Sequence, residues 1–175
     1  WAGLRIEPIV GYSMGDYKTS ALTTHLESNG RVDGFTYGGR LGWMFDGIFI
    51  GGEYQAARAQ LKTDGTGEAT NWTNKTIFGE LGYEFLMGLR VYAGMNVVPH
   101  ESDVATTPSH TVYKGSAKKF GLGFQYRAPF AVNAEYIMYD FDEYQTGAVK
   151  AKTSTLFEKF NYNAVVLSLS FPFTL

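Results

Sequence analysis

Along most of this chain, apolar and polar side chains alternate with a period of two. Between positions 35 and 45, every second residue is apolar or glycine, and the interleaved positions include Thr36 and Arg40. Because successive side chains of a β-strand point to opposite faces, the alternation predicts strands with one apolar face. The same pattern predicts eight strands, at 4–13, 35–45, 48–56, 76–85, 89–97, 120–127, 132–139 and 164–175.

The connections between these strands alternate in length. Short turns at Asp46-Gly47, Leu86 to Gly88 and Ala128-Pro129 alternate with long polar stretches at 15–34, 60–75, 98–115 and 141–159. Such alternation is typical of up-and-down barrels that cross a membrane, with tight turns on one side. We therefore expect one all-β domain over 1–175. It would be an eight-stranded antiparallel transmembrane barrel with a polar lumen, four long loops on one side and three short turns on the other.

The charges within the strands lie on the face opposite to the apolar one. The faces predicted to point inward carry five acidic and four basic residues: Arg5, Glu7, Arg40, Glu53, Glu80, Glu84, Arg90, Arg127 and Glu135. In a soluble lipocalin-like barrel, the alternative fold, these charges would lie in a dry core, where each needs a partner. With lipid outside and a lumen inside, both faces have suitable surroundings. We expect an Arg–Glu network in a lumen that side chains largely fill.

Aromatic residues gather towards the predicted strand ends, where amphipathic rings favour a membrane interface. Near the short turns lie Trp43, Phe45, Tyr83, Phe85, Tyr126, Phe171 and Phe173. Near the long connections lie Phe35, Tyr37, Tyr113, Phe120 and Tyr139. We expect these two sets to form the two aromatic girdles of a membrane barrel.

Composition excludes several other classes of protein. The 175 residues contain no cysteine, which excludes disulfide scaffolds and thiolate metal sites. A net charge of −2 speaks against a nucleic-acid partner held by bulk basic charge. No apolar run approaches the roughly 18 residues of a transmembrane helix, a limit that does not apply to barrel strands. No signal peptide is visible, and we expect one to have been removed.

The chain ends in the alternating run VVLSLSFPFTL, with Phe173 two residues before the terminal Leu175. This run and the topology resemble the small eight-stranded outer-membrane barrels of Gram-negative bacteria, the OmpA/OmpX-like class. The resemblance implies an outer-membrane location, contacts with the lipid bilayer and lipopolysaccharide, and recognition of the C-terminal strand by the barrel-assembly machinery. Pro8 and Pro172 interrupt the two strands that must pair to close the barrel, so we expect a bulge or frayed register there.

Candidate catalytic chemistry is sparse. His25, His100 and His110 fall in predicted loops, where they and the nearby Glu101, Ser102, Asp103 and Ser109 are expected to be solvated. The acidic run Asp140, Asp142 and Glu143 is compatible with a divalent cation or with an exposed strand end. We expect no catalytic residues, no metal and no cofactor. The favoured function is a surface protein whose polar loops meet an extracellular partner or support the envelope. The alternatives are a narrow pore, then an outer-membrane hydrolase or acyltransferase.

Overall fold

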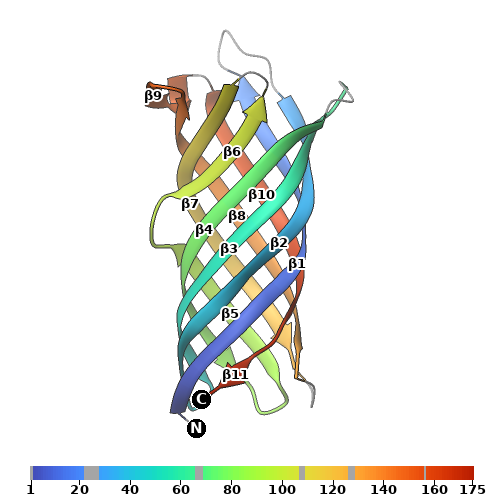
Figure 1. Cartoon of the computed structure of the whole chain (residues 1–175), viewed down its shortest axis with the longest axis vertical. Helices are drawn as coiled ribbons and strands as arrows, with labels where there is room; N and C mark the ends of the chain where they lie inside the picture. The colour runs from blue at the N-terminus through green and yellow to red at the C-terminus, as the bar shows by residue number, and fades with distance from the viewer. Residues whose placement is uncertain (1, 22–27, 66–68, 107–108, 126–128, 156) are drawn as a thin grey trace.

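The strands form one closed, tilted barrel (Figure 1). The computed structural model describes residues 2–21, 28–65, 69–106, 109–125, 129–155 and 157–175. Its elements are β1 (Ala2–Ala21), β2 (Ser28–Phe45), β3 (Ile48–Thr63), β4 (Ala69–Glu84), β5 (Leu89–Asn96), β6 (His100–Thr106), β7 (Ser109–Phe124), β8 (Ala131–Thr146), β9 (Val149–Lys152), the 3₁₀ turn η1 (Thr153–Thr155), β10 (Phe157–Ser170) and β11 (Phe173–Thr174). Within these residues, no helix is long and apolar enough to cross a membrane.

Antiparallel pairing closes a ring of eight strand positions, as the sequence predicted. β5 and β6 share one position between β4 and β7, and β10 returns to pair with β1. The short turns and both termini lie at one end, called here the turn end (Figure 1). The Asp46-Gly47 turn has positive φ at both residues, 47° and 83°, as expected for this hairpin sequence.

The opposite end, called here the hairpin end, carries the four long connections. These connections are built largely of strand: β1 continues to Ala21, β3 to Thr63 and β8 to Thr146. Within the stretch predicted as a loop at 98–115, residues 100–106 form β6 and residues 109–115 form the first part of β7. The sequence pattern did not reveal these extensions, because their outer faces are polar and their inner faces mix polar residues with buried aromatic ones, so the apolar–polar alternation is lost.

The seam between the first and last strands stays in register across both prolines. Ile9 faces Ser170 and Ile6 faces Phe173, so the bulge expected there is absent from this stretch. Phe171 donates its N–H to Pro8 O, 3.0 Å away, so the next residue, Pro172, points its nitrogen away from β1. On that side the neighbouring strand is β8, which begins at Ala131 opposite Ser170 and does not reach Pro172. Pro172 therefore removes no ladder hydrogen bond. Only the missing N–H of Pro8 costs the seam a donor.

The wall is interrupted at 97–99, where β5 ends and β6 begins. The Asn96 side chain bridges it. Asn96 Nδ2 donates to Gly115 O at 3.2 Å, and Asn96 Oδ1 accepts from the backbone N–H of Ala117 at 2.9 Å. A side-chain amide thus replaces the backbone partners that the break removes.

The outer face carries a continuous apolar belt. Exposed side chains on it include Val10, Leu41, Leu81, Leu122 and Leu167. Six of the seven aromatic residues predicted near the short turns are exposed on the outer face: Trp43, Phe45, Tyr83, Phe85, Phe171 and Phe173. The seventh, Tyr126, lies outside the described residues.

The hairpin-end half of the interior is an aromatic core, which the sequence did not predict. Trp72, Phe141, Phe160 and Tyr162 pack with ring centroids 4.6–6.4 Å apart. Tyr139 is buried in this cluster and Tyr113 packs against it, so the prediction that both join the outer girdle is wrong. Both side chains point inward from their strands. Their position near a strand end, on which the prediction relied, does not determine which face a side chain occupies.

We predict that Trp72→Ala lowers the free energy of unfolding by about 3–5 kcal/mol, because it leaves a large cavity among packed rings. Trp43→Ala is the matched control, since Trp43 is 64% exposed on the outer face and its loss opens no internal cavity. Urea unfolding in detergent micelles, followed by circular dichroism, compares the two. Equal losses would contradict a packed core at Trp72.

Candidate functional site: the charged lumen

The turn-end half of the interior holds a network of acidic and basic side chains from seven strands. Seven of the nine residues predicted for the lumen lie here, all at most 5% exposed: Arg5, Glu7, Arg40, Glu53, Glu80, Arg90 and Glu135. Glu84 lies at the turn-end mouth, with 28% of its side chain exposed. Arg127 lies outside the described residues.

Arg40 is the hub of the network. Its guanidinium donates from Nε to Glu80 at 2.6 Å and from Nη2 to Glu53 at 2.6 Å and Glu135 at 3.2 Å. Nη1 reaches Glu7 at 3.3 Å. The ring of Tyr92 lies 4.3 Å from the guanidinium carbon, and the Tyr92 hydroxyl donates to Glu135 at 2.8 Å. One arginine therefore joins four carboxylates.

Lys119 is the second cation of this layer, and the sequence analysis missed it. Its ammonium lies 2.7 Å from Glu53 Oε1 and 3.5 Å from Glu135 Oε1, and it also pairs with Glu80. The predicted strand began one residue later, at Phe120. Extending the alternation by one position would have placed Lys119 on the inward face, where it lies fully buried.

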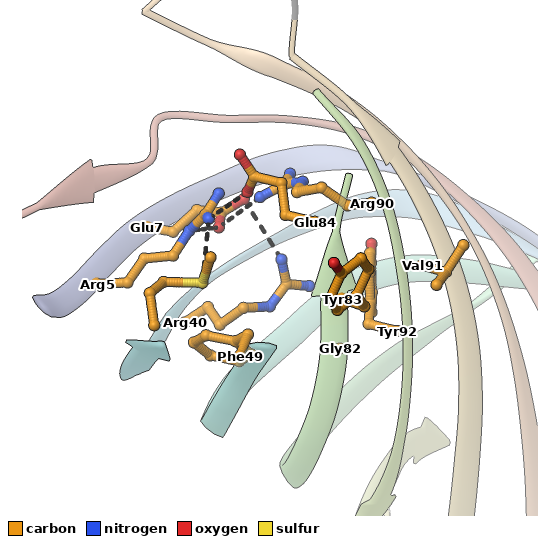
Figure 2. A pocket seen from close by; sticks show the side chains of 11 residues that line it. Arg5, Glu7, Arg40, Phe49, Gly82, Tyr83, Glu84, Arg90, Val91 and Tyr92 are labelled. Carbon is orange, nitrogen blue, oxygen red and sulfur yellow. Dashed lines mark hydrogen bonds and ion pairs between the residues drawn. The ribbon is translucent and has the colours of Figure 1, made fainter. Parts of the chain in front are cut away.

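A second layer lies nearer the mouth (Figure 2). Arg5 donates to Glu7 at 3.0 Å and to Glu84 at 2.6 Å, while Arg90 donates to Glu7 at 2.8 Å and to Asn133 at 2.5 Å. A cavity of about 20 Å³ lies among these side chains, with room for about one water molecule. Across both layers, Arg5, Arg40, Arg90 and Lys119 balance four buried glutamates, Glu7, Glu53, Glu80 and Glu135.

Small residues make room for this packing. A Cβ on Gly121 would overlap the Tyr92 ring, and one on Gly42 would meet Phe49 at 2.7 Å. The inward glycines thus let large side chains cross a narrow barrel, which is why the network reaches from wall to wall.

His100 is fully buried, contrary to the expectation of a solvated loop residue. It starts β6 and packs against Tyr139, with ring centroids 4.4 Å apart and ring planes at 39° to each other. Ser102 gives its only hydroxyl proton to Asn74 Oδ1, so it accepts from His100 Nε2 at 2.8 Å. His100 Nδ1 is then the acceptor for Thr76 Oγ1, at 2.7 Å. With these donors and acceptors, the His100 imidazole is neutral and carries its proton on Nε2.

The other candidate catalytic and metal-binding residues do not come together in space. His110 is exposed and lies 3.3 Å from Asp103, and His25 falls outside the described residues. Within the described part of the chain, no three His, Asp or Glu side chains are placed to hold a metal ion. Asp140, Asp142 and Glu143 line a crevice on the outer wall beside β9.

Comparison with known proteins finds likeness in structure alone. No family model and no curated sequence matches the chain. Among solved structures, Ail of Yersinia pestis shares 13% identity and a TM-score of 0.59, covering 98% of this chain and 99% of that one. OprG of Pseudomonas aeruginosa gives 13% and 0.56, covering 99% and 97%, and Neisserial surface protein A gives 12% and 0.55, covering 98% of each chain.

The chain has the fold of the small eight-stranded outer-membrane β-barrels. Its outer face carries the apolar belt with which barrels of this fold contact lipid. In such barrels the short turns are periplasmic and the long connections extracellular. We therefore expect the turn end of this barrel to be its periplasmic end, and the hairpin end its extracellular end.

We predict that Lys119→Met lowers the stability of the barrel by about 3–5 kcal/mol, because it leaves buried carboxylates without a cation. Lys62→Met, at an exposed position of β3, should change stability by less than about 0.5 kcal/mol. Adding Glu53→Gln to Lys119→Met should restore part of the loss. Urea unfolding in micelles measures all three, and no rescue in the double variant would contradict the ion pair.

We also predict that the barrel loses stability as the pH falls below about 6.5. β6 lies beyond the lipid belt, since its outward side chains include the charged Glu101 and Asp103. Burial lowers the pKa of His100 from 6.5 to about 3. Between these values the unfolded chain binds a proton that the folded barrel does not, which costs up to about 1.4 kcal/mol per pH unit. His100→Phe should flatten this slope, whereas His110→Phe should leave it unchanged.

Proposed function

We propose that this protein is an integral outer-membrane barrel with a closed lumen, whose function lies in its extracellular hairpins. The observation that carries the proposal is that side chains fill both halves of the barrel interior. The charged network spans the periplasmic half, and the aromatic cluster around Trp72 fills the extracellular half.

The electrostatics of the lumen support closure over conduction. An ion passing the middle of the barrel would displace Arg40 or Lys119, each of which holds at least three carboxylates. Parting buried ion pairs is costly because each partner is left uncompensated. A narrow pore therefore requires a rearrangement of the whole layer.

The polar cluster at His100 does not support a hydrolase. The Ser102 hydroxyl is fully buried and gives its proton to Asn74 instead of His100. A serine nucleophile needs the reverse, with the imidazole accepting the hydroxyl proton and a carboxylate orienting the ring. We therefore propose a non-enzymatic protein.

The hairpins are the surface left for a partner, since they extend past the lipid belt with charged side chains on the outer face. One solved relative in fold, Ail, was crystallised with the heparin analogue sucrose octasulfate, so sulfated glycans are a partner class to test here. We further propose that the assembly machinery reads the C-terminal strand, where Phe171 and Phe173 face outward.

The test is single-channel recording in planar bilayers, with heat-modifiable gel mobility to verify folding. We expect folded wild-type protein to give no current steps. Tyr92→Ala combined with Phe78→Ala should produce small steps, because both rings cross the lumen beside Arg40 and Lys119.

Deletion of residues 103–112, the tip of the β6–β7 hairpin, serves as the control. Because it leaves the charged network of the lumen intact, we expect that variant to stay silent. Steps from wild-type protein would refute the closed lumen. Current steps from the deletion variant alone would show that the hairpin, and not the side chains in the lumen, closes the barrel.

A further inference from the structure

The turn between β4 and β5 is apolar throughout. It reads Phe85-Leu86-Met87-Gly88, and β5 begins directly after it. Leu86 is fully exposed and Met87 is 75% exposed, so neither side chain packs against the barrel. The β2–β3 turn at the same end of the barrel instead places the carboxylate of Asp46 in an exposed position (Figure 1). Packing within the chain therefore does not explain why both residues of the β4–β5 turn are apolar.

The backbone of the turn does not explain them either. Gly88 N–H donates to Phe85 O at 2.8 Å, which closes the turn. Gly88 has a φ of 78°, and a Cβ at this position would overlap Gln125 O, so glycine is required there. At positions 86 and 87 the polar residues common in turns would serve as well. The apolar character of these two positions therefore indicates a partner outside the chain.

The turn holds these two side chains in a defined place. Phe85 N–H donates to Leu89 O at 2.8 Å, so the strands pair up to the turn itself. Gln125 N–H donates to Gly88 O at 2.9 Å and ties the turn to the end of β7. Because the backbone is already ordered, little conformational entropy is lost when the turn meets a partner.

The surface of the turn is continuous with the apolar belt. Tyr83 and Phe85 are exposed at the end of β4, with ring centroids 4.9 Å apart. On the other side of the turn, the exposed Leu89 faces Phe124 across the β5–β7 ladder. The belt that contacts lipid thus extends from both strands onto Leu86 and Met87.

The charged residues that flank the turn belong to the lumen. Glu84, directly before Phe85, accepts a hydrogen bond from Arg5 at 2.6 Å. Arg90, directly after Leu89, is buried and donates to Glu7 at 2.8 Å. The sequence between Glu84 and Arg90 contains no charged residue. The outer surface of the turn is therefore both apolar and uncharged, which suits lipid better than water.

We propose that Leu86 and Met87 form an apolar anchor, which inserts into the interfacial region of the lipid leaflet at the turn end. The short turns of such barrels generally lie in the aqueous compartment, and the Asp46-Gly47 turn keeps that arrangement. The anchor thus holds the β4–β5 side of the barrel more deeply in the leaflet than the β2–β3 side. The inference is independent of what the hairpins bind and of whether the lumen conducts.

The experiment measures the depth of a spin label on each turn. The chain has no cysteine, so Met87→Cys and the matched control Asp46→Cys each create a single labelling site. Labelled barrels are folded into phosphatidylcholine vesicles at a high ratio of lipid to protein. Electron paramagnetic resonance then compares collisions of the label with oxygen, which concentrates in lipid, and with a water-soluble nickel chelate. Leu81→Cys, at a position 59% exposed on the belt, marks full immersion in lipid.

We expect nickel collisions at position 87 to be roughly tenfold less frequent than at position 46, the factor that burial of one such apolar side chain supplies. Equal nickel collisions at the two turns would overturn the proposal. Adding Leu86→Asp to Met87→Cys should return the label to water, because a charge opposes insertion. A label that stays protected in this double variant would contradict the role of Leu86.

A second series varies the ratio of lipid to protein, because contact between two barrels would also protect the label. Protection that persists when barrels are far apart supports the lipid anchor. Protection that appears only in crowded vesicles would assign the turn to a second copy of the chain and overturn the choice of lipid. Heat-modifiable gel mobility verifies folding, and substitution at these exposed positions opens no internal cavity.

Discussion

Backbone pairing at the depth of the hydrocarbon is the constraint on which this structure depends. Without water, each N–H and C=O of the wall needs a partner within the protein, so the sheet must close. Two places threaten that closure. At the seam, the register holds through Pro8 and Pro172, and only one donor is lost. At the break between β5 and β6, the amide of Asn96 pairs with two backbone groups of β7, Gly115 O and Ala117 N–H.

Closure at eight strand positions makes the barrel narrow, and the narrow barrel determines what the interior can contain. Each layer is stabilised in its own way. The ionic layer balances four cations against four glutamates, and the aromatic layer packs ring edges against ring faces with few polar atoms to satisfy. The inner glycines permit both layers, because they let Tyr92 and Phe49 occupy space that a Cβ would fill. The narrowness of the wall and the filling of the lumen therefore depend on each other.

Alternation predicted the outer face of the barrel well, because lipid accepts only apolar side chains and the period survives over whole strands. It also placed Arg40, Glu53 and Glu135 on the inner face. It did not predict the strands beyond the belt, where both faces are polar or aromatic and the period disappears. Trp72 and Phe141 were therefore assigned to loops, and Lys119 fell one residue outside a strand. The burial of His100 depends on contacts with β4 and β8, which no local pattern in the sequence encodes.

The ring order has a consequence for how the chain folds. All pairings around the described wall join strands that are near neighbours in sequence, except the seam, where Ile9 meets Ser170. The entropy of closing a long loop is therefore concentrated in a single late event. Until that event, the edges of β1 and β10 are exposed and can pair with a foreign strand. The same edge that completes the barrel is the point at which a second chain could interrupt its folding.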